Sequence, residues 1–181
     1  MDAIFKSFLE EQEAEASELA SRSDLFELLP MGSSPYQHYL VRFGCRGLVD
    51  TPEGIVEAEL FDIGVYFPLD YWQRVNPAEV ITLLGPTNTF HPNVLFPYVS
   101  PGRLTPGTSL TDIIMQCFEI LTYQKQTMRE DDALNTRACA WARRHPERFP
   151  VDDRPIAGRP LEYRIRETET IGEQLVPEEE R

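Results

Sequence analysis

Hydrophobic and polar residues alternate in the middle of the chain. Tyr39, Val41, Phe43 and Cys45 occupy every second position, and the turn-forming residues 50–54 follow them. Successive side chains of a strand point to opposite faces, so this period is that of a half-buried strand. The pattern therefore predicts a strand that leads into a compact turn.

A second extended run covers residues 55–67, and its apolar positions change phase midway. They are even-numbered up to Leu60 and odd-numbered from Phe61 onward. A slip of one residue predicts either a β-bulge or a strand whose two halves are covered differently. A third strand is predicted at residues 79–84, before a Gly-Pro pair. Short strands joined by compact turns favour an antiparallel meander.

Before this zone, the apolar period is helical. Residues 2–29 are rich in Glu, Ala and Leu, and Ile4 lies four positions before Phe8. This spacing predicts an amphipathic helix with a narrow apolar stripe. Pro30 and Gly32 are expected to end it.

After the zone, apolar residues again recur every three or four positions, at Leu110, Ile113, Ile114, Cys117, Ile120 and Leu121. The pattern predicts a helix with one broad buried face. Ser109, with Asp112 three residues later, is typical of a helix N-cap. A further helix is predicted at residues 133–144. The order of elements indicates an α+β protein.

Length and composition favour one domain with an extension. A chain of 181 residues with 41% apolar content is long enough to build one sizeable core. We assign residues 1–150 to this domain. Residues 151–181 form a proline-rich and acidic extension, in which the alternation at 161–165 allows a short added strand. Its last residues, 177–181, are expected to be disordered.

Charge and cysteine content narrow the classes of function. The net charge of −13 opposes a surface that neutralises phosphates, so we expect no nucleic acid and favour a partner with a basic face. The chain shows no signal-peptide pattern and no membrane-length apolar run. Three cysteines without a CxxC pair argue against disulfides and zinc, and favour the reducing cytoplasm. We expect no metal and no cofactor.

Several motifs occur in a characteristic order. They are the Phe67–Tyr71 segment (Phe-Pro-Leu-Asp-Tyr), Pro77, the Phe90–Val94 segment (Phe-His-Pro-Asn-Val) and the Asp131–Asn135 segment (Asp-Asp-Ala-Leu-Asn). Over residues 3–145 this order resembles the ubiquitin-conjugating (E2) enzymes. Trp72 stands where that family usually has proline. The resemblance implies a UBC-like fold: an N-terminal helix, an antiparallel meander of about four strands, and C-terminal helices.

The resemblance also implies an active site without its nucleophile. In the family, a cysteine after a Gly-x-x segment accepts a ubiquitin-like C-terminus as a thioester. Here Gly102-Arg103-Leu104 leads to Thr105, and no cysteine lies between Cys45 and Cys117. All three cysteines are interpreted as small core residues. A hydroxyl nucleophile would need an activating base, and the sequence identifies none.

The other family positions are retained. Asn93 is expected either to stabilise an oxyanion or to hold the loop backbone, and Asp132 to occupy the acidic gate. Pro92 completes the segment, and His91 is interpreted as structural, fixing the turn through backbone hydrogen bonds.

The leading hypothesis is a catalytically inactive conjugating-enzyme variant. It would bind a ubiquitin-like modifier, an active E2 or another assembly partner of the pathway. Trp72, Phe96 and Tyr98 are the candidate partner-binding residues, because aromatic side chains in exposed loops are common anchors; Trp72 has the alternative of capping the core. Two other functions stay open: an active enzyme that uses Thr105, and a scaffold subunit unrelated to modifiers.

Overall fold

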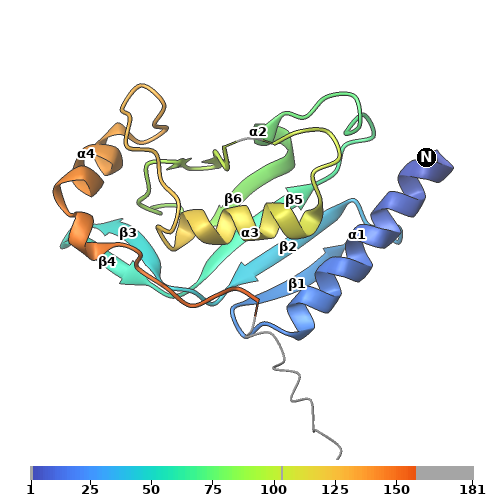
Figure 1. Ribbon diagram of the computed structural model, residues 1–181, viewed down its shortest axis with the longest axis horizontal. Helices are drawn as coiled ribbons and strands as arrows, with labels where there is room; N and C mark the ends of the chain where they lie inside the picture. Colours follow the sequence, from blue (N-terminus) through green and yellow to red (C-terminus); the bar gives the residue numbers. More distant parts are fainter. Residues whose placement is uncertain (1, 103, 158–181) are drawn as a thin grey trace, which may run out of the picture.

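The computed structural model describes residues 2–102 and 104–157 of the chain. It shows an α+β protein with an N-terminal helix, an antiparallel sheet and C-terminal helices (Figure 1). This confirms the coarse architecture predicted from the periodicity. The strand predicted at 161–165 and the disorder predicted at 177–181 lie outside the described residues.

The main sheet has six strands in the order β1-β2-β5-β6-β8-β7, and all neighbouring strands are antiparallel. Its strands are β1 (Phe26–Met31), β2 (His38–Phe43), β5 (Phe61–Tyr66), β6 (Ile81–Gly85), β7 (Val94–Leu95) and β8 (Tyr98–Val99). The strand predicted at 79–84 starts two residues late, because Asn76 caps the one-turn helix α2 (Pro77–Val80) in front of it.

The N-terminal helix is shorter than predicted. Helix α1 spans Ala3–Ser21, so the prediction of a helix over residues 2–29 was wrong at its end. The chain turns at Ser23, whose hydroxyl accepts a hydrogen bond from the Leu25 backbone N–H (3.2 Å). It then pairs with β2 as the edge strand β1. An edge position tolerates Pro30, which was predicted to lie beyond a helix end and lies inside this strand.

The extended run at residues 55–67 is two strands. The first half is β4 (Gly54–Ala58), which forms a separate hairpin with β3 (Gly47–Thr51); the second half is β5 of the main sheet. The phase change at Leu60 marks the point where the chain passes from the two-stranded sheet to the main sheet. Of the two alternatives, the run is therefore one whose two halves are covered differently. The register irregularity of β5 occurs between Asp62 and Ile63, where β5 pairs with β6.

The helices after the sheet agree closely with the prediction. Helix α3 spans Leu110–Leu121, and the Ser109 hydroxyl accepts from the Asp112 backbone N–H (3.1 Å) as expected of an N-cap. Helix α4 spans Thr136–Arg144 and starts later than predicted, because Asn135 caps it. A 3₁₀ turn follows at Pro146–Arg148.

Helix α3 crosses one face of the main sheet, and α1 lies along β1 and α3 (Figure 1). The main core forms between these layers. A second cluster joins the β3–β4 hairpin to α4 and to the segment before β7; its buried members are Leu48, Phe90, Tyr123, Ala138, Ala142 and Val151. This second cluster positions the candidate site. Over the described part of the chain, no helix is both long enough and apolar enough to cross a membrane.

Candidate functional site

The Phe90–Val94 segment lies between the β3–β4 hairpin and the start of α4. The Phe90 backbone N–H donates to the Leu48 carbonyl (2.8 Å), and the Asn135 N–H donates to the Pro92 carbonyl (3.0 Å). The structure therefore places the Asp131–Asn135 segment beside the His-Pro-Asn segment, although 37 residues lie between them in the sequence.

His91 is buried and uses its imidazole on the chain itself. Nδ1 accepts a hydrogen bond from the Asn93 backbone N–H (3.0 Å), so the neutral ring carries its proton on Nε2. Burial lowers the pKa of His91 to about 3; the nearby Lys125 backbone opposes this shift. No atom of the described residues meets the geometry of a hydrogen bond to the buried Nε2. A neutral, enclosed imidazole favours the structural interpretation of this residue.

The Asn93 side chain clamps two loops. Its Oδ1 accepts from the Thr127 backbone N–H (2.9 Å), and its Nδ2 donates to the Ser100 carbonyl (3.2 Å). The Ser100 N–H in turn donates to the Asn93 carbonyl (2.8 Å). Of the two roles expected for Asn93, this geometry favours holding the loop backbone over stabilising an oxyanion.

Thr105 is exposed and belongs to a local turn. Its backbone N–H donates to the Thr108 hydroxyl (3.1 Å), the two hydroxyls lie 3.3 Å apart, and the Thr108 hydroxyl donates to the Thr105 carbonyl (2.7 Å). Within the described residues, no carboxylate or imidazole hydrogen-bonds to the Thr105 hydroxyl. The geometry thus supplies no general base for this side chain.

The three cysteines are buried and free, as predicted for core residues. Burial raises the pKa of Cys45 and of Cys117 to about 12, and it also raises the pKa of Cys139. The thiolate is the reactive form of cysteine, so these thiols stay protonated and unreactive near neutral pH.

Asp132, the residue expected to occupy the acidic gate, is exposed and paired. The Arg129 guanidinium contacts it at 3.3 Å and also binds Asp131, whose pKa it lowers. Sequence reasoning missed Arg129, because residues 129–132 lie in a loop where no helical spacing predicts the pairing. The acidic character of this segment is therefore partly neutralised locally.

The candidate partner-binding aromatic residues are all about half exposed. Trp72 is 49% exposed and packs edge-on against Phe8, with 5.1 Å between ring centroids. Its contact with Phe8 agrees with the alternative of capping the core, and the rest of the side chain is open to solvent. It borders a hollow of about 420 Å³ whose other lining residues are Asp2, Ile4, Phe5, Leu69 and Gln73. Tyr98 lies on β8, and Phe96 lies in the turn between β7 and β8. Neither residue lines this hollow.

Tyr98 continues a row of side chains across the outer sheet face, which sequence reasoning missed. Directly opposite residues of antiparallel strands point to the same face. The register links Leu29, Leu40, Gly64, Thr82, Tyr98 and Leu95 in one row over all six strands. Leu95 and Tyr98 at its end are each about half exposed.

Sequence reasoning also missed the role of the loop after α3, which contains Tyr123 and Lys125. The Tyr123 hydroxyl donates to the Phe90 carbonyl (2.6 Å), and Lys125 Nζ donates to the Pro101 carbonyl (2.8 Å). Together with Asn93, these side chains hold the chain on both sides of the β7–β8 hairpin against the loop that follows α3. No sequence motif marks Tyr123 or Lys125, because their partners are backbone carbonyls.

A scan against protein-family models and a search of curated proteins both find no match to this chain.

Proposed function

We propose that this protein is a catalytically inactive, conjugating-enzyme-like scaffold with a UBC-like fold. It would bind a ubiquitin-like modifier, an active conjugating enzyme or another protein of such a pathway. The order of the helices, the antiparallel sheet and the contact between the two motif segments support the proposal.

One observation carries the inactive part of the proposal. Three polar atoms of the candidate site are bound to the chain's own backbone: His91 Nδ1 to Asn93, and the Asn93 amide oxygen and nitrogen to Thr127 and Ser100. The thiols are buried, and the Thr105 hydroxyl is paired only with Thr108 among the described residues. Among the described residues, such a site offers neither an exposed thiol nor a base bound to the Thr105 hydroxyl, which supports a binding role over a catalytic one.

The binding part rests on the exposed aromatic side chains. Trp72, Phe96 and Tyr98 are 46–50% exposed, and aromatic anchors dominate the energy of many protein interfaces. The net charge of −13 favours a partner with a basic face, because opposite charge speeds encounter. A ubiquitin-like protein, an E2 or another pathway protein with such a face is the proposed partner.

A pairwise binding measurement tests the proposal. Purified ubiquitin-like proteins and conjugating enzymes from the same genome are titrated against the wild-type chain and the variants W72A, F96A and Y98A. We expect at least one protein to bind and to lose about tenfold in affinity, roughly 1.4 kcal/mol, with at least one variant.

Leu60→Ala is the matched control. Leu60 is exposed to a similar extent, 54%, but it lies between β4 and β5 and belongs to neither segment that carries the three aromatic residues. Thermal melting of each variant separates lost binding from lost folding. Binding of no candidate protein, or equal binding by all variants, would contradict the proposal.

A further inference from the structure

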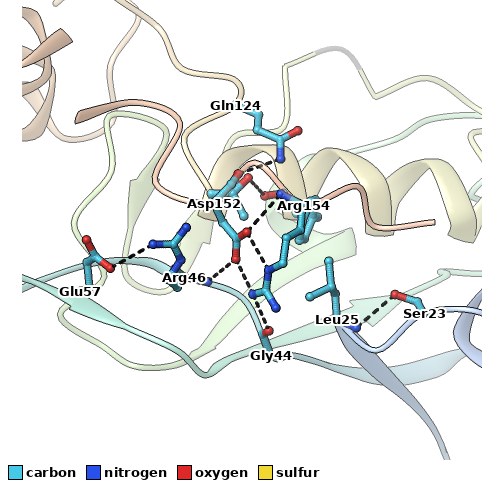
Figure 2. A network of polar contacts seen from close by, with 10 residues as sticks. Ser23, Leu25, Gly44, Arg46, Glu57, Gln124, Asp152 and Arg154 are labelled. Carbon is cyan, nitrogen blue, oxygen red and sulfur yellow. Dashed lines mark hydrogen bonds and ion pairs between the residues drawn. The ribbon is translucent and has the colours of Figure 1, made fainter. Parts of the chain in front are cut away.

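A buried carboxylate fastens the end of the described chain onto the domain (Figure 2). The Asp152 side chain is fully buried. It accepts hydrogen bonds from the Arg46 backbone N–H (2.9 Å) and from Arg154 Nε (2.9 Å). A second Arg154 nitrogen lies 2.6 Å from the carboxylate. A charge removed from water in this way is tolerated only when it is paired, and Arg154, two residues later, is its partner. The Arg46 N–H and the contact of Arg154 with the Gly44 carbonyl (3.4 Å) join this pair to the domain. Residues 149–156 are here called the C-terminal strap.

The strap is bound to the end of α3. The Val151 N–H donates to the Thr122 carbonyl (2.9 Å), and Gln124 Nε2 donates to the Asp152 carbonyl (3.0 Å). The Phe149 ring stacks on the Tyr123 ring, with 4.4 Å between centroids and 4° between planes. The strap therefore contacts each of the first three residues after α3.

Tyr123, between these contacts, has a left-handed backbone with φ of 60°. This conformation is unfavourable for a bulky residue and persists only where its surroundings enforce it. Phe149 stacks on the ring, and His91 meets it edge-on at 4.3 Å. The hydroxyl is bound to the Phe90 carbonyl. One of the three contacts that enforce this conformation, the Phe149 stacking, comes from the strap. The other two, with His91 and Phe90, come from the candidate site.

The loop that Tyr123 begins also holds the segment that carries the exposed aromatic side chains. Asn93 Oδ1 accepts a hydrogen bond from the Thr127 N–H, and Lys125 Nζ donates one to the Pro101 carbonyl. Phe96 and Tyr98 lie between these two anchor points. A continuous chain of contacts therefore runs from Asp152 through residues 122–127 to residues 93–101.

We propose that the C-terminal strap is a latch that keeps the 93–101 segment ordered through Tyr123. When the contacts of Asp152 with Arg154 and with the Arg46 N–H are weakened, residues 122–127 relax and their contacts with Asn93 and Pro101 open more often. The consequence for partner binding rests on the proposed function, whereas the latch itself does not. It is testable with the protein alone.

Hydrogen exchange of single amides in the full chain tests the latch. Asp152→Asn removes the buried charge, and Asp153→Asn makes the same change one residue later on an exposed side chain. With Asp152→Asn we expect the Thr127 and Ser100 amides to exchange about tenfold faster while the amides of β2 and β5 are unchanged. Asp153→Asn is expected to match the wild type. Should Asp152→Asn fail to fold, Arg154→Met, which breaks the same ion pair from its half-exposed side, takes its place.

Two results would overturn the latch. In the first, the Val151 amide of the strap exchanges faster while Thr127 and Ser100 keep wild-type rates, so the strap is an independent tail. In the second, every amide including those of β2 and β5 accelerates by the same factor, so the strap contributes only to global stability. Failure of the binding measurement would leave these exchange rates unaffected, so the two proposals fail separately.

Discussion

The neutral imidazole of His91 makes the stability of the protein depend on pH. Its folded-state pKa is about 3, below the ordinary value of 6.5, because the ring is buried. Between these two values the unfolded chain binds a proton that the folded chain excludes. The free energy of unfolding therefore falls as the pH is lowered through this range, by up to about 1.4 kcal/mol per pH unit.

His91→Asn isolates this effect, since it removes the titrating ring but keeps a side-chain acceptor near the Asn93 N–H. Between about pH 7 and about pH 5, we expect the wild type to lose roughly 2 kcal/mol more unfolding free energy than the variant. Urea denaturation at the two pH values measures the difference, and the carboxylates common to both chains cancel. Equal losses in the two chains would show that His91 is not held neutral.

The Asn93 amide is expected to contribute to stability through its two backbone contacts. Asn93→Ala would leave the Thr127 N–H and the Ser100 carbonyl without these partners, which costs about 1–3 kcal/mol. Asn88→Ala is the control, because it removes one exposed contact to the Asp50 carbonyl and is expected to cost less than about 1 kcal/mol. Urea denaturation compares them. Wild-type stability of Asn93→Ala would mean that the amide is not structurally required.

At the level of elements, the β3–β4 hairpin approaches the end of α3 closely at Gly47. A Cβ on this residue would lie 2.6 Å from the Leu121 carbonyl oxygen and 2.7 Å from the Phe61 ring. Only glycine therefore allows the hairpin, the main sheet and α3 to approach this closely. The next residue, Leu48, accepts the hydrogen bond from the Phe90 N–H, so the junction also positions the candidate site.

Gly47→Ala is expected to lower the free energy of unfolding by about 3 kcal/mol, because the backbone oxygen cannot move aside. Gly44→Ala, three residues earlier, meets nothing closer than 3.9 Å and is expected to change it by less than about 0.5 kcal/mol. Thermal or urea unfolding of both variants checks the prediction. Similar stabilities would contradict the close packing of the hairpin.

Local periodicity was sufficient to predict β2, β5 and α3 from the sequence, since each of them buries one regular face. It failed for β1: Phe26–Met31 shows no clean alternation, and pairing with β2 decides its conformation. At the candidate site, the motifs marked both segments, but no local pattern encodes the contact between Pro92 and Asn135. The strap could not be predicted, because Asp152 binds a backbone N–H 106 residues earlier and no local pattern encodes that partner.

For the whole molecule, the central claim is binding without covalent transfer. Asn93 holds its loop through backbone contacts, the thiols are buried, and Trp72, Phe96 and Tyr98 are about half exposed. The two halves of the claim are separable by mass, because a noncovalent complex dissociates on denaturation and an ester or thioester adduct does not.

Mass spectrometry of one reaction mixture measures both. The chain is incubated with an activating enzyme, ATP, a ubiquitin-like modifier and an active conjugating enzyme of the same genome, whose own charging is the positive control. We predict a noncovalent complex containing the chain under native conditions, and an unchanged mass of the chain after denaturation. A hydroxylamine-sensitive adduct on the denatured chain that is lost with Thr105→Ala, or no complex while the control enzyme is charged, would contradict the account.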